Sequence, residues 1–349
     1  PYSLRTEVQP KMTQLSDQLT TSTEEPAGKM ECDAIEIRIE GKALRVPCVS
    51  ISGRTIIATG KWLKVAAVQD EDLWEGEAVD APVVFFDALK KSKLKADVFT
   101  FAQQPAATKP NYGYFMEWDN AAAIPIKGYA NWLESLPQET RRNIKKAAKS
   151  GVILKSVPFD DSLVKGIVDI YDETPVRQGR AFWHYQKGFQ KIKEEKATYL
   201  QRSEFIGAYL NEELIGFIKL VYVGEYASIL HILSKVKHAD KRPTNALIAK
   251  AVEICAERGK SYLLYCKYVY GKNDTSPLTE FKRRNGFEKL QYPRYYIPLT
   301  SYGNLVLKLR LHHGFVNMLP KSLVAAARIV RKKCFEAVGK KNSSGAKTD

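Results

Sequence analysis

The sequence predicts a mixed α/β fold made of two halves, followed by a basic helical extension at the C-terminus. A length of 349 residues suits two domains, and 44% hydrophobic residues supply ordinary buried cores. In the second half, runs with strand alternation and runs with helical spacing follow one another, which is typical of a sheet covered by helices. We predict a mobile leader over residues 1–32, halves over 33–150 and 151–300, basic helices over 301–338 and a disordered tail over 339–349.

The composition restricts the partners and the compartment. A net charge of +15 favours an anionic partner, such as nucleic acid, an anionic membrane face, a phosphorylated cofactor or an acidic carrier protein. The five cysteines are scattered and form no C-x-x-C pair, which suits a reducing compartment. The histidines show no metal-ligand spacing, and the adjacent His312 and His313 could not face one ion from a helix, so we expect no metal. With no long apolar run and no signal core, we expect a soluble, cytoplasmic chain.

The first half is predicted to begin with short strands joined by tight turns. Ile35, Ile37 and Ile39 alternate with charged residues, and Gly41 and Gly53 mark the turns. The segments that follow are interpreted as a helix over 62–76, a helix and a strand over 82–104, a loop, one amphipathic basic helix from 129 to Gly151, and a strand over 152–157.

The second half is predicted to alternate helices and strands. The segment 160–179 has helical spacing and is stopped by Pro175, and Ser276 is placed to cap a helix that begins at Pro277. The predicted order is helices over 160–174 and 184–200, a hairpin over 204–224, a strand over 226–236, a helix over 243–259, a strand over 261–271, a helix over 276–287 and a strand over 288–300. Two further helices, broken at Pro320, are expected over 304–338.

This order resembles the GNAT acyltransferase fold. The strand and helix of "LHILSKVKHADKRPTNALIAKAVEICAERG" correspond to the acyl-CoA turn of that family, and "SYLLYCKYVYG" to its next, splayed strand. "LTEFKRRNGFEKL", with Phe281 and Asn285-Gly286-Phe287, resembles its closing signature. "LESLPQETRRNIKKAAKSGV" and "IYDETPVRQGRAFWHY" resemble the Fem-type, double-GNAT proteins, which transfer an aminoacyl or acyl group. The resemblance covers roughly residues 35–300, and it makes residues 33–150 a degenerate GNAT-like half.

The resemblance implies an acyl donor, acetyl-CoA or another acyl-CoA, whose pyrophosphate binds backbone N–H groups at a helix N-terminus. The family pattern [QR]-x-x-G-x-[GA] falls on residues 239–244, where Arg242 and Thr244 replace the usual glycines and restrict backbone approach. Binding would then depend on basic side chains and on a Thr or Asn cap; the alternative is a capped core helix with solvated basic residues. The candidate donor-binding residues are Leu233, Lys235, Lys241, Arg242, Thr244 and Asn245.

The loop within "YDETPVRQGRAFWHY" is the candidate acceptor site, because it gathers charged and aromatic groups beside Pro175 and Gly179. Glu173 and His184 are candidate bases. The candidate substrate-binding residues are Arg177, Arg180, Trp183 and Tyr185, and the two arginines would hold an acidic acceptor. The alternative is a network of ion pairs within the loop, with Trp183 packed beneath it.

His231 lies within an apolar strand, on the face opposite Leu230 and Ile232. It is either a base that works at neutral pH or a hydrogen-bonded core histidine. The resemblance implies direct attack of an amine on the thioester without a covalent enzyme intermediate, and a tyrosine that protonates the leaving thiolate. Tyr268 is the candidate, with Tyr265 and Tyr270 as alternatives, and Cys266 is interpreted as a buried structural thiol.

Three functions remain open from the sequence. The first is an N-acetyltransferase-like acyltransferase that uses acyl-CoA or a carrier-protein thioester. The second is a Fem-like transferase that uses aminoacyl-tRNA and acts on a cell-envelope precursor. The third is an inactive GNAT-like module that binds an anionic partner. The basic face of 141–149 and the basic segment 304–341 are either solvated surfaces or contacts to tRNA phosphate or to the inner face of an anionic membrane.

Overall fold

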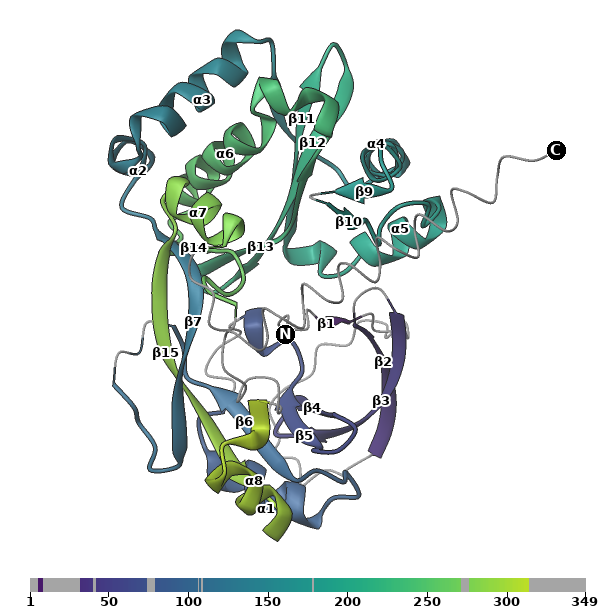
Figure 1. Ribbon diagram of the computed structural model, residues 1–349, viewed down its shortest axis with the longest axis vertical. Coiled ribbons are helices and arrows are strands. Elements are labelled where there is room, and N and C mark those ends of the chain that lie inside the picture. Colours follow the sequence, from purple (N-terminus) through teal and green to yellow (C-terminus); the bar gives the residue numbers. More distant parts are fainter. Residues whose placement is uncertain are drawn as a thin grey trace, which may run out of the picture.

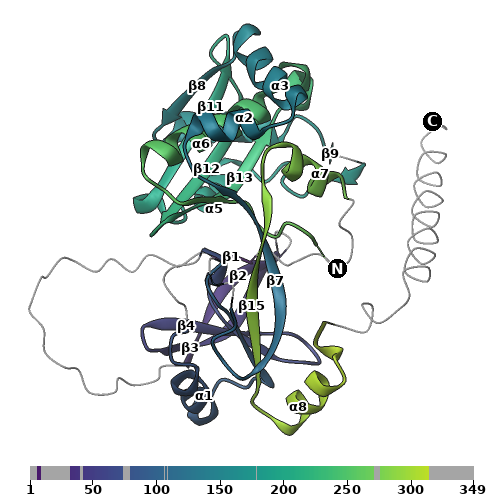
Figure 2. The ribbon, with the colours of Figure 1, turned by 90° about the vertical axis from the view of Figure 1, so that its left-hand side faces the viewer.

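The computed structural model describes residues 6–8, 32–39, 42–73, 79–105, 107, 109–177, 179–270 and 276–313. These residues form two lobes joined by two long strands, β7 (Phe115–Pro125) and β15 (Glu288–Pro298), which run through both lobes (Figures 1 and 2). No helix among these residues has the length and apolar character needed to cross a bilayer.

The N-terminal lobe packs a twisted sheet against helix α1. Phe85 and Leu89 of this helix are buried against Phe99 and Phe101 of the sheet. The elements are β1 (Thr6–Val8), β2 (Cys32–Ile39), β3 (Lys42–Ile51), β4 (Arg54–Thr59), β5 (Val65–Val68), η1 (Glu71–Leu73), α1 (Pro82–Lys91), β6 (Val98–Ala102), and, after β15, α8 (Ser301–Lys308) and η4 (Leu311–His313).

The C-terminal lobe is a sheet with helices on both faces. Helix α6 buries Leu247 and Val252 on one face, and α4 and α5 bury Ile167 and Ile192 on the other. The elements are α2 (Tyr129–Ser135), α3 (Gln138–Lys149), β8 (Ile153–Val157), α4 (Asp161–Tyr171), β9 (Val176–Arg177), β10 (Arg180–Ala181), α5 (Phe189–Lys196), η2 (Leu200–Arg202), β11 (Ser203–Leu210), β12 (Glu213–Val223), β13 (Tyr226–Ser234), η3 (Val236–Lys241), α6 (Pro243–Glu257), β14 (Tyr262–Leu264) and α7 (Pro277–Arg284).

The two lobes repeat one topology and exchange their last strands. Among the described residues the shared sheet has the order β1-β2-β3-β4-β5-β6-β15-β7-β14-β13-β12-β11-β8. In each lobe antiparallel strands lead to one parallel pair, β5–β6 or β13–β14, whose strands are connected by a helix, α1 or α6. Strand β7 of the first half then pairs with β14, whereas β15 of the second half pairs with β6. Apart from the additional edge strand β1, the strand order is therefore symmetric about the central β7–β15 pair.

Several sequence-based expectations are confirmed in the C-terminal lobe. The hairpin β11–β12, the helices α4 and α6, and the cap of α7 by Ser276 lie where they were predicted. The glycine of the closing signature, Gly286, has a φ of +81°, and a side chain there would collide with Trp132 of α2. The signature therefore ends α7 and lets the following strand pass beneath α2.

Other expectations were wrong because long-range pairing outweighed local propensity. The predicted helix over 62–76 is instead the strand β5, paired on both edges, followed by the short turn η1. The loop predicted before residue 129 includes the long strand β7, whose alanine run Ala121–Ala123 is a weak strand former but is central in the sheet.

The predicted basic helix of residues 129–150 is two helices, α2 and α3, that meet at Pro137, because proline cannot continue the first one. Both pack against α6 of the C-terminal lobe. The predicted strand over 261–271 is limited to β14. Of the two helices predicted over 304–338, α8 covers 301–308, and the residues from 314 onward lie outside the described ones. The proposed limits of the two halves stay a prediction.

Candidate functional site

Strands β13 and β14 begin side by side and then part. They pair in parallel from Tyr226↔Tyr262 to Ser228↔Leu264, where the pairing ends. After Leu264 the chain turns toward β7: the Tyr265 N–H donates to the Ala122 carbonyl at 2.8 Å. Strand β13 continues to Ser234 and pairs only with β12 in the described structure. Its residues are buried up to Ile229 and half-exposed beyond, so the far part of β13 presents an open edge.

Helix α6 starts at the end of this open edge with an uncapped N-terminus. Arg242 occupies the N-cap position in the left-handed region, at φ 58°, and makes no side-chain cap hydrogen bond. The expectation that Thr244 or Asn245 caps the helix is wrong. The Thr244 hydroxyl instead bonds that of Ser234 at 2.9 Å, and the Asn245 amide donates to the Asn285 side-chain oxygen at 2.9 Å. The first turn of α6 therefore keeps N–H groups and the positive end of the helix dipole for an anion.

The basic residues around this turn are largely neutralised by acidic partners. Glu213 forms ion pairs with Lys235, Lys237 and His238 at 2.6, 2.8 and 3.2 Å. Hydrogen bonds from Lys235 and Lys237 lower the pKa of Glu213 to about 2. Lys241 pairs with Asp240 at 3.0 Å. Arg242 is exposed and has no ion pair with any residue that the structure describes. Among the residues predicted to bind the acyl donor, it is therefore the cation most available to an anionic ligand.

Glu173 and Arg177 connect the predicted acceptor loop to the turn before α6. The Glu173 carboxylate accepts from the backbone N–H groups of Val236 and Lys237 at 2.6 and 2.8 Å, and from Arg177 at 3.2 Å. Arg177 also donates to the carbonyls of Ser234 and Ile170, both at 2.8 Å. These contacts give both residues a positioning role. The catalytic role of Glu173 and the acceptor-binding role of Arg177 stay predictions.

The rest of the loop forms an aromatic stack. The His184 ring is buried, with its centroid 3.5 Å from the ring of Trp183 and 4.4 Å from that of Tyr171. Trp183 is exposed on its outer side, and the Lys187 ammonium lies 4.0 Å from its ring centroid. Arg180 is also exposed, and Tyr185 is half-buried. An acceptor at this loop would therefore meet Arg180 and Trp183 before it met His184.

His231 lies on the open part of β13, opposite Lys219 of β12. The Lys196 ammonium is 3.2 Å from His231 Nε2. When Lys196 carries its charge, the facing nitrogen of His231 accepts this hydrogen bond, since an ammonium group can only donate. Both lysines are completely buried, and the Lys219 ammonium donates to the Lys196 carbonyl at 2.8 Å and to the Thr198 hydroxyl at 3.1 Å.

Neither lysine was identified from the sequence. In "LIGFIKLVYV", Lys219 shares a strand face with Phe217 and Val221. This alternation is the sequence signal that could have identified Lys219 as a buried cation. The position of Lys196 beside His231 depends on the packing of α5 on the sheet, which no local pattern reports.

Comparisons with known proteins agree with this arrangement of strands and helices. No protein-family model matches the chain. The solved structure of FemX superposes with a TM-score of 0.51 and 12% identity, covering 75% of this chain and 88% of that one.

The chain has a duplicated GNAT fold of the Fem type.

Two further similarities are weaker or partial. The structure of L-PGS from Bacillus licheniformis superposes with a TM-score of 0.49 and 14% identity, over 76% of this chain and 87% of that one. Over 85 residues the chain is 31% identical to the spermidine N(1)-acetyltransferase of Thermoplasma acidophilum. The match covers 24% of this chain and 50% of the length of that protein. The predicted fold class and the resemblance to Fem-type GNAT proteins are confirmed.

The remaining predicted residues lie in the C-terminal lobe, on β13 and on the segment that follows β14. Leu233 is half-buried on the open part of β13 and packs toward α4. Tyr268 lies on the segment after β14, where its carbonyl accepts from the Thr279 hydroxyl of α7 at 3.4 Å. Cys266, expected to be buried, is half-buried in a left-handed turn with φ 51°. The strands therefore place His231 and Tyr268 on different segments beyond the point of separation.

A separate hollow lies between α2 and α3, away from this strand edge. Its volume is about 330 Å³, and it is lined by Tyr129, Leu133, Glu134, Arg141, Ile144, Lys145 and Ala148. The open edge of β13 offers backbone pairing and a helix N-terminus, which a hollow between two helices does not. We therefore place the candidate site at the parting strands.

Proposed function

We propose that this tandem GNAT protein is a transferase that moves an acyl or aminoacyl group from an anionic donor to an amine. The observation that carries the proposal is the parting of β13 and β14 beside the uncapped start of α6. An extended donor arm could add to the open edge of β13 as a short strand. Its phosphates would then lie at the N-terminus of α6, next to the exposed Arg242.

In the proposed reaction the amine nitrogen attacks the carbonyl carbon of the donor. The new C–N bond forms while the bond to the thiol or hydroxyl leaving group breaks, so catalysis depends mainly on positioning. His231 is the candidate base that takes the amine proton, since it lies on the open part of β13. Tyr268 is the candidate that returns a proton to the leaving group. Arg180 and Trp183 are the candidate contacts of the acceptor.

An acyl-CoA is our first candidate donor. The partial sequence match to a protein named as an N-acetyltransferase supports it. The turn before α6 has fewer uncompensated cations than its sequence suggests, because Glu213 binds Lys235 and Lys237. Binding of a CoA would therefore depend on the helix N-terminus and on Arg242 more than on the neighbouring lysines.

Aminoacyl-tRNA is our second candidate, because a basic helix borders the same turn. Helix α3 packs beside η3, and the Lys146 charge acts on the Asp240 carboxylate of that turn. A polyanion held at α6 could continue along the basic residues of α3, which are Arg141, Arg142, Lys145, Lys146 and Lys149. The FemX fold similarity is compatible with such a donor. Contact of residues 304–341 with an anionic membrane, or binding of an acyl carrier protein, stays a prediction.

Binding experiments separate the two donors. Isothermal titration with acetyl-CoA and with longer acyl-CoAs should give saturable heat if a CoA is the donor, and no binding at millimolar ligand excludes it. A gel shift with aminoacylated and uncharged tRNA tests the alternative. The double variant Lys145→Glu/Lys146→Glu should abolish the shift and leave CoA binding unchanged. If neither ligand binds, the chain is not a transferase of either kind.

A further inference from the structure

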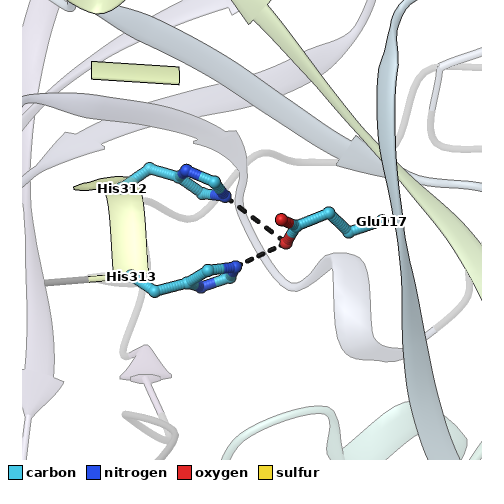
Figure 3. A group of neighbouring side chains, drawn as sticks. All are labelled: Glu117, His312 and His313. Carbon is cyan, nitrogen blue, oxygen red and sulfur yellow. Dashed lines mark hydrogen bonds and ion pairs between the residues drawn. The ribbon is translucent and has the colours of Figure 1, made fainter. Parts of the chain in front are cut away.

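Two histidines and a glutamate from distant parts of the chain converge in the N-terminal lobe (Figure 3). Glu117 lies on β7, and His312 and His313 lie on η4, which follows α8. One ligand atom from each residue, two imidazole nitrogens and a carboxylate oxygen, lie within 4.8 Å of one another. The expectation that adjacent histidines could not face one point is wrong here, because η4 is a tight turn and both rings point toward Glu117.

His312 is held in an unusual environment for an imidazole. Its side chain is 2% exposed and packs edge-on against Phe115, with Tyr296 on another side. Neither of its buried ring nitrogens has a hydrogen-bond partner among the residues that the structure describes. Its Nε2 lies 3.3 Å from a Glu117 carboxylate oxygen, outside good hydrogen-bond geometry. A buried imidazole nitrogen thus faces an anionic oxygen without good hydrogen-bond geometry, an arrangement that a bound cation would satisfy.

The spacing fits ligands that share one ion. Two ligands at about 2.0–2.1 Å from a tetrahedral Zn²⁺ lie roughly 3.3 Å apart. The His312–Glu117 separation is 3.3 Å, and His313 Nε2 contacts the same carboxylate oxygen. Imidazole nitrogens favour zinc, nickel, cobalt or copper over calcium and magnesium, which prefer oxygen ligands.

We propose that Glu117, His312 and His313 bind one divalent transition-metal ion such as Zn²⁺. The ion ties η4, the last turn that the structure describes, to strand β7. The preceding helix α8 lies in the N-terminal lobe, far from α6 and the parting strands (Figure 1). The proposed ion is therefore structural, and the proposal does not depend on the transferase activity.

The test is metal binding by the full chain, with any affinity tag removed and the protein stripped with a chelator. Titration with Zn²⁺ against a chromophoric chelator should give one site per chain, and Co²⁺ should give the visible absorption of a tetrahedral site. Zn²⁺ should also raise the melting temperature of the wild-type protein. No binding at micromolar Zn²⁺ overturns the proposal.

Two variants and a matched control locate the ion. Glu117→Gln keeps the shape of the side chain, and His313→Ala removes a side chain that is 46% exposed, so the fold should tolerate both changes. Each should weaken Zn²⁺ binding at least tenfold and remove the thermal shift. The control His238→Ala changes a histidine that pairs with Glu213 in the other lobe, and it should bind Zn²⁺ like the wild type. Unchanged binding by both site variants overturns the assignment.

Discussion

At the scale of single residues, Glu173 was predicted as a catalytic base, but its contacts in the fold are those of a residue that holds a turn. Its carboxylate accepts hydrogen bonds from two backbone N–H groups of the turn that precedes α6 and from Arg177. These donors occupy both oxygens of the carboxylate, so its contacts are with the turn and with Arg177 and not with a substrate. Its position therefore favours a role in holding the turn where the donor phosphates are proposed to bind.

The substitution Glu173→Gln separates the two roles. An amide would place an NH₂ group against backbone donors, so we expect a loss of about 1–3 kcal/mol in the free energy of unfolding. Donor KM should rise while the pH dependence of kcat stays the same. Urea unfolding measures the free energy of unfolding, and a pH–rate profile measures the pH dependence of kcat. The control is Glu212→Gln, a change of an exposed residue. Loss of one limb of the pH profile at unchanged stability would identify Glu173 as the base instead.

At the scale of elements, the start of α6 combines a strained residue with an uncapped helix end. Arg242 adopts a left-handed conformation that glycine adopts without a steric penalty, and Pro243 follows at the first helical position. Its side chain is exposed at the place where the positive end of the helix dipole is available. The start of α6 is therefore suited to bind an anion, both through the charge of Arg242 and through the N–H groups of its first turn.

The substitution Arg242→Gly tests the charge without disturbing the backbone. Relief of the left-handed strain and the greater chain entropy of glycine oppose each other, so stability should change by less than about 1 kcal/mol. Affinity for the anionic donor should fall roughly tenfold, which corresponds to about 1.4 kcal/mol. Arg242→Lys should retain most of the affinity. Equal donor binding by Arg242→Gly and the wild type would remove Arg242 from the site.

The cap of α7 gives a prediction about stability alone. The Ser276 hydroxyl accepts from the Thr279 N–H at 3.1 Å, as the sequence predicted. Replacement by alanine should cost about 1 kcal/mol of unfolding free energy, and Ser276→Asp should restore most of it. Thermal or urea denaturation measures the difference. No change in Ser276→Ala would mean that the first turn of α7 is satisfied by another group.

At the scale of the whole molecule, the exchanged strands make the lobes depend on each other. A buried charge cluster lies where they meet: Arg294 of β15 pairs with Asp119 of β7 and with Glu71, both at 2.8 Å. Lys267, on the segment after β14, pairs with Asp119 at 2.9 Å. Burial raises the pKa of Asp119, but the charges of Arg294 and Lys267 outweigh it and lower the pKa from 3.8 to about 2.

This cluster predicts how stability depends on pH. Because the pKa of Asp119 is lower in the folded protein, its contribution is present above about pH 4 and is lost as the pH falls toward 2. Arg294→Met removes the arginine partner of two buried carboxylates, of which Asp119 keeps its ion pair with Lys267, and should cost roughly 3–5 kcal/mol at neutral pH. The deficit should shrink as the pH falls through that range.

Urea unfolding across the pH range, followed by both tryptophan fluorescence and far-UV circular dichroism, measures this effect. The two probes should report one transition, because each lobe contains a strand of the other. The exposed Arg45→Met is the control. Wild-type stability in Arg294→Met, or two separate transitions, would contradict the coupling of the lobes.

The sequence by itself determined the elements whose signals are local. Alternating apolar residues predicted the hairpin β11–β12, helical spacing predicted α4 and α6, and Ser276-Pro277 predicted the start of α7. Their order was sufficient to indicate a GNAT fold, because that fold is defined by the order of its strands and helices.

The tertiary structure alone decided which distant residues meet. The alanine-rich strand β7 forms because β15 and β14 pair with its two edges. His231 meets Lys196 through the packing of α5, and Glu117 meets His312 because η4 lies against the first lobe. Strand pairing, burial and ligand geometry all depend on partners far away in the chain, and a local pattern of residue types does not specify such partners.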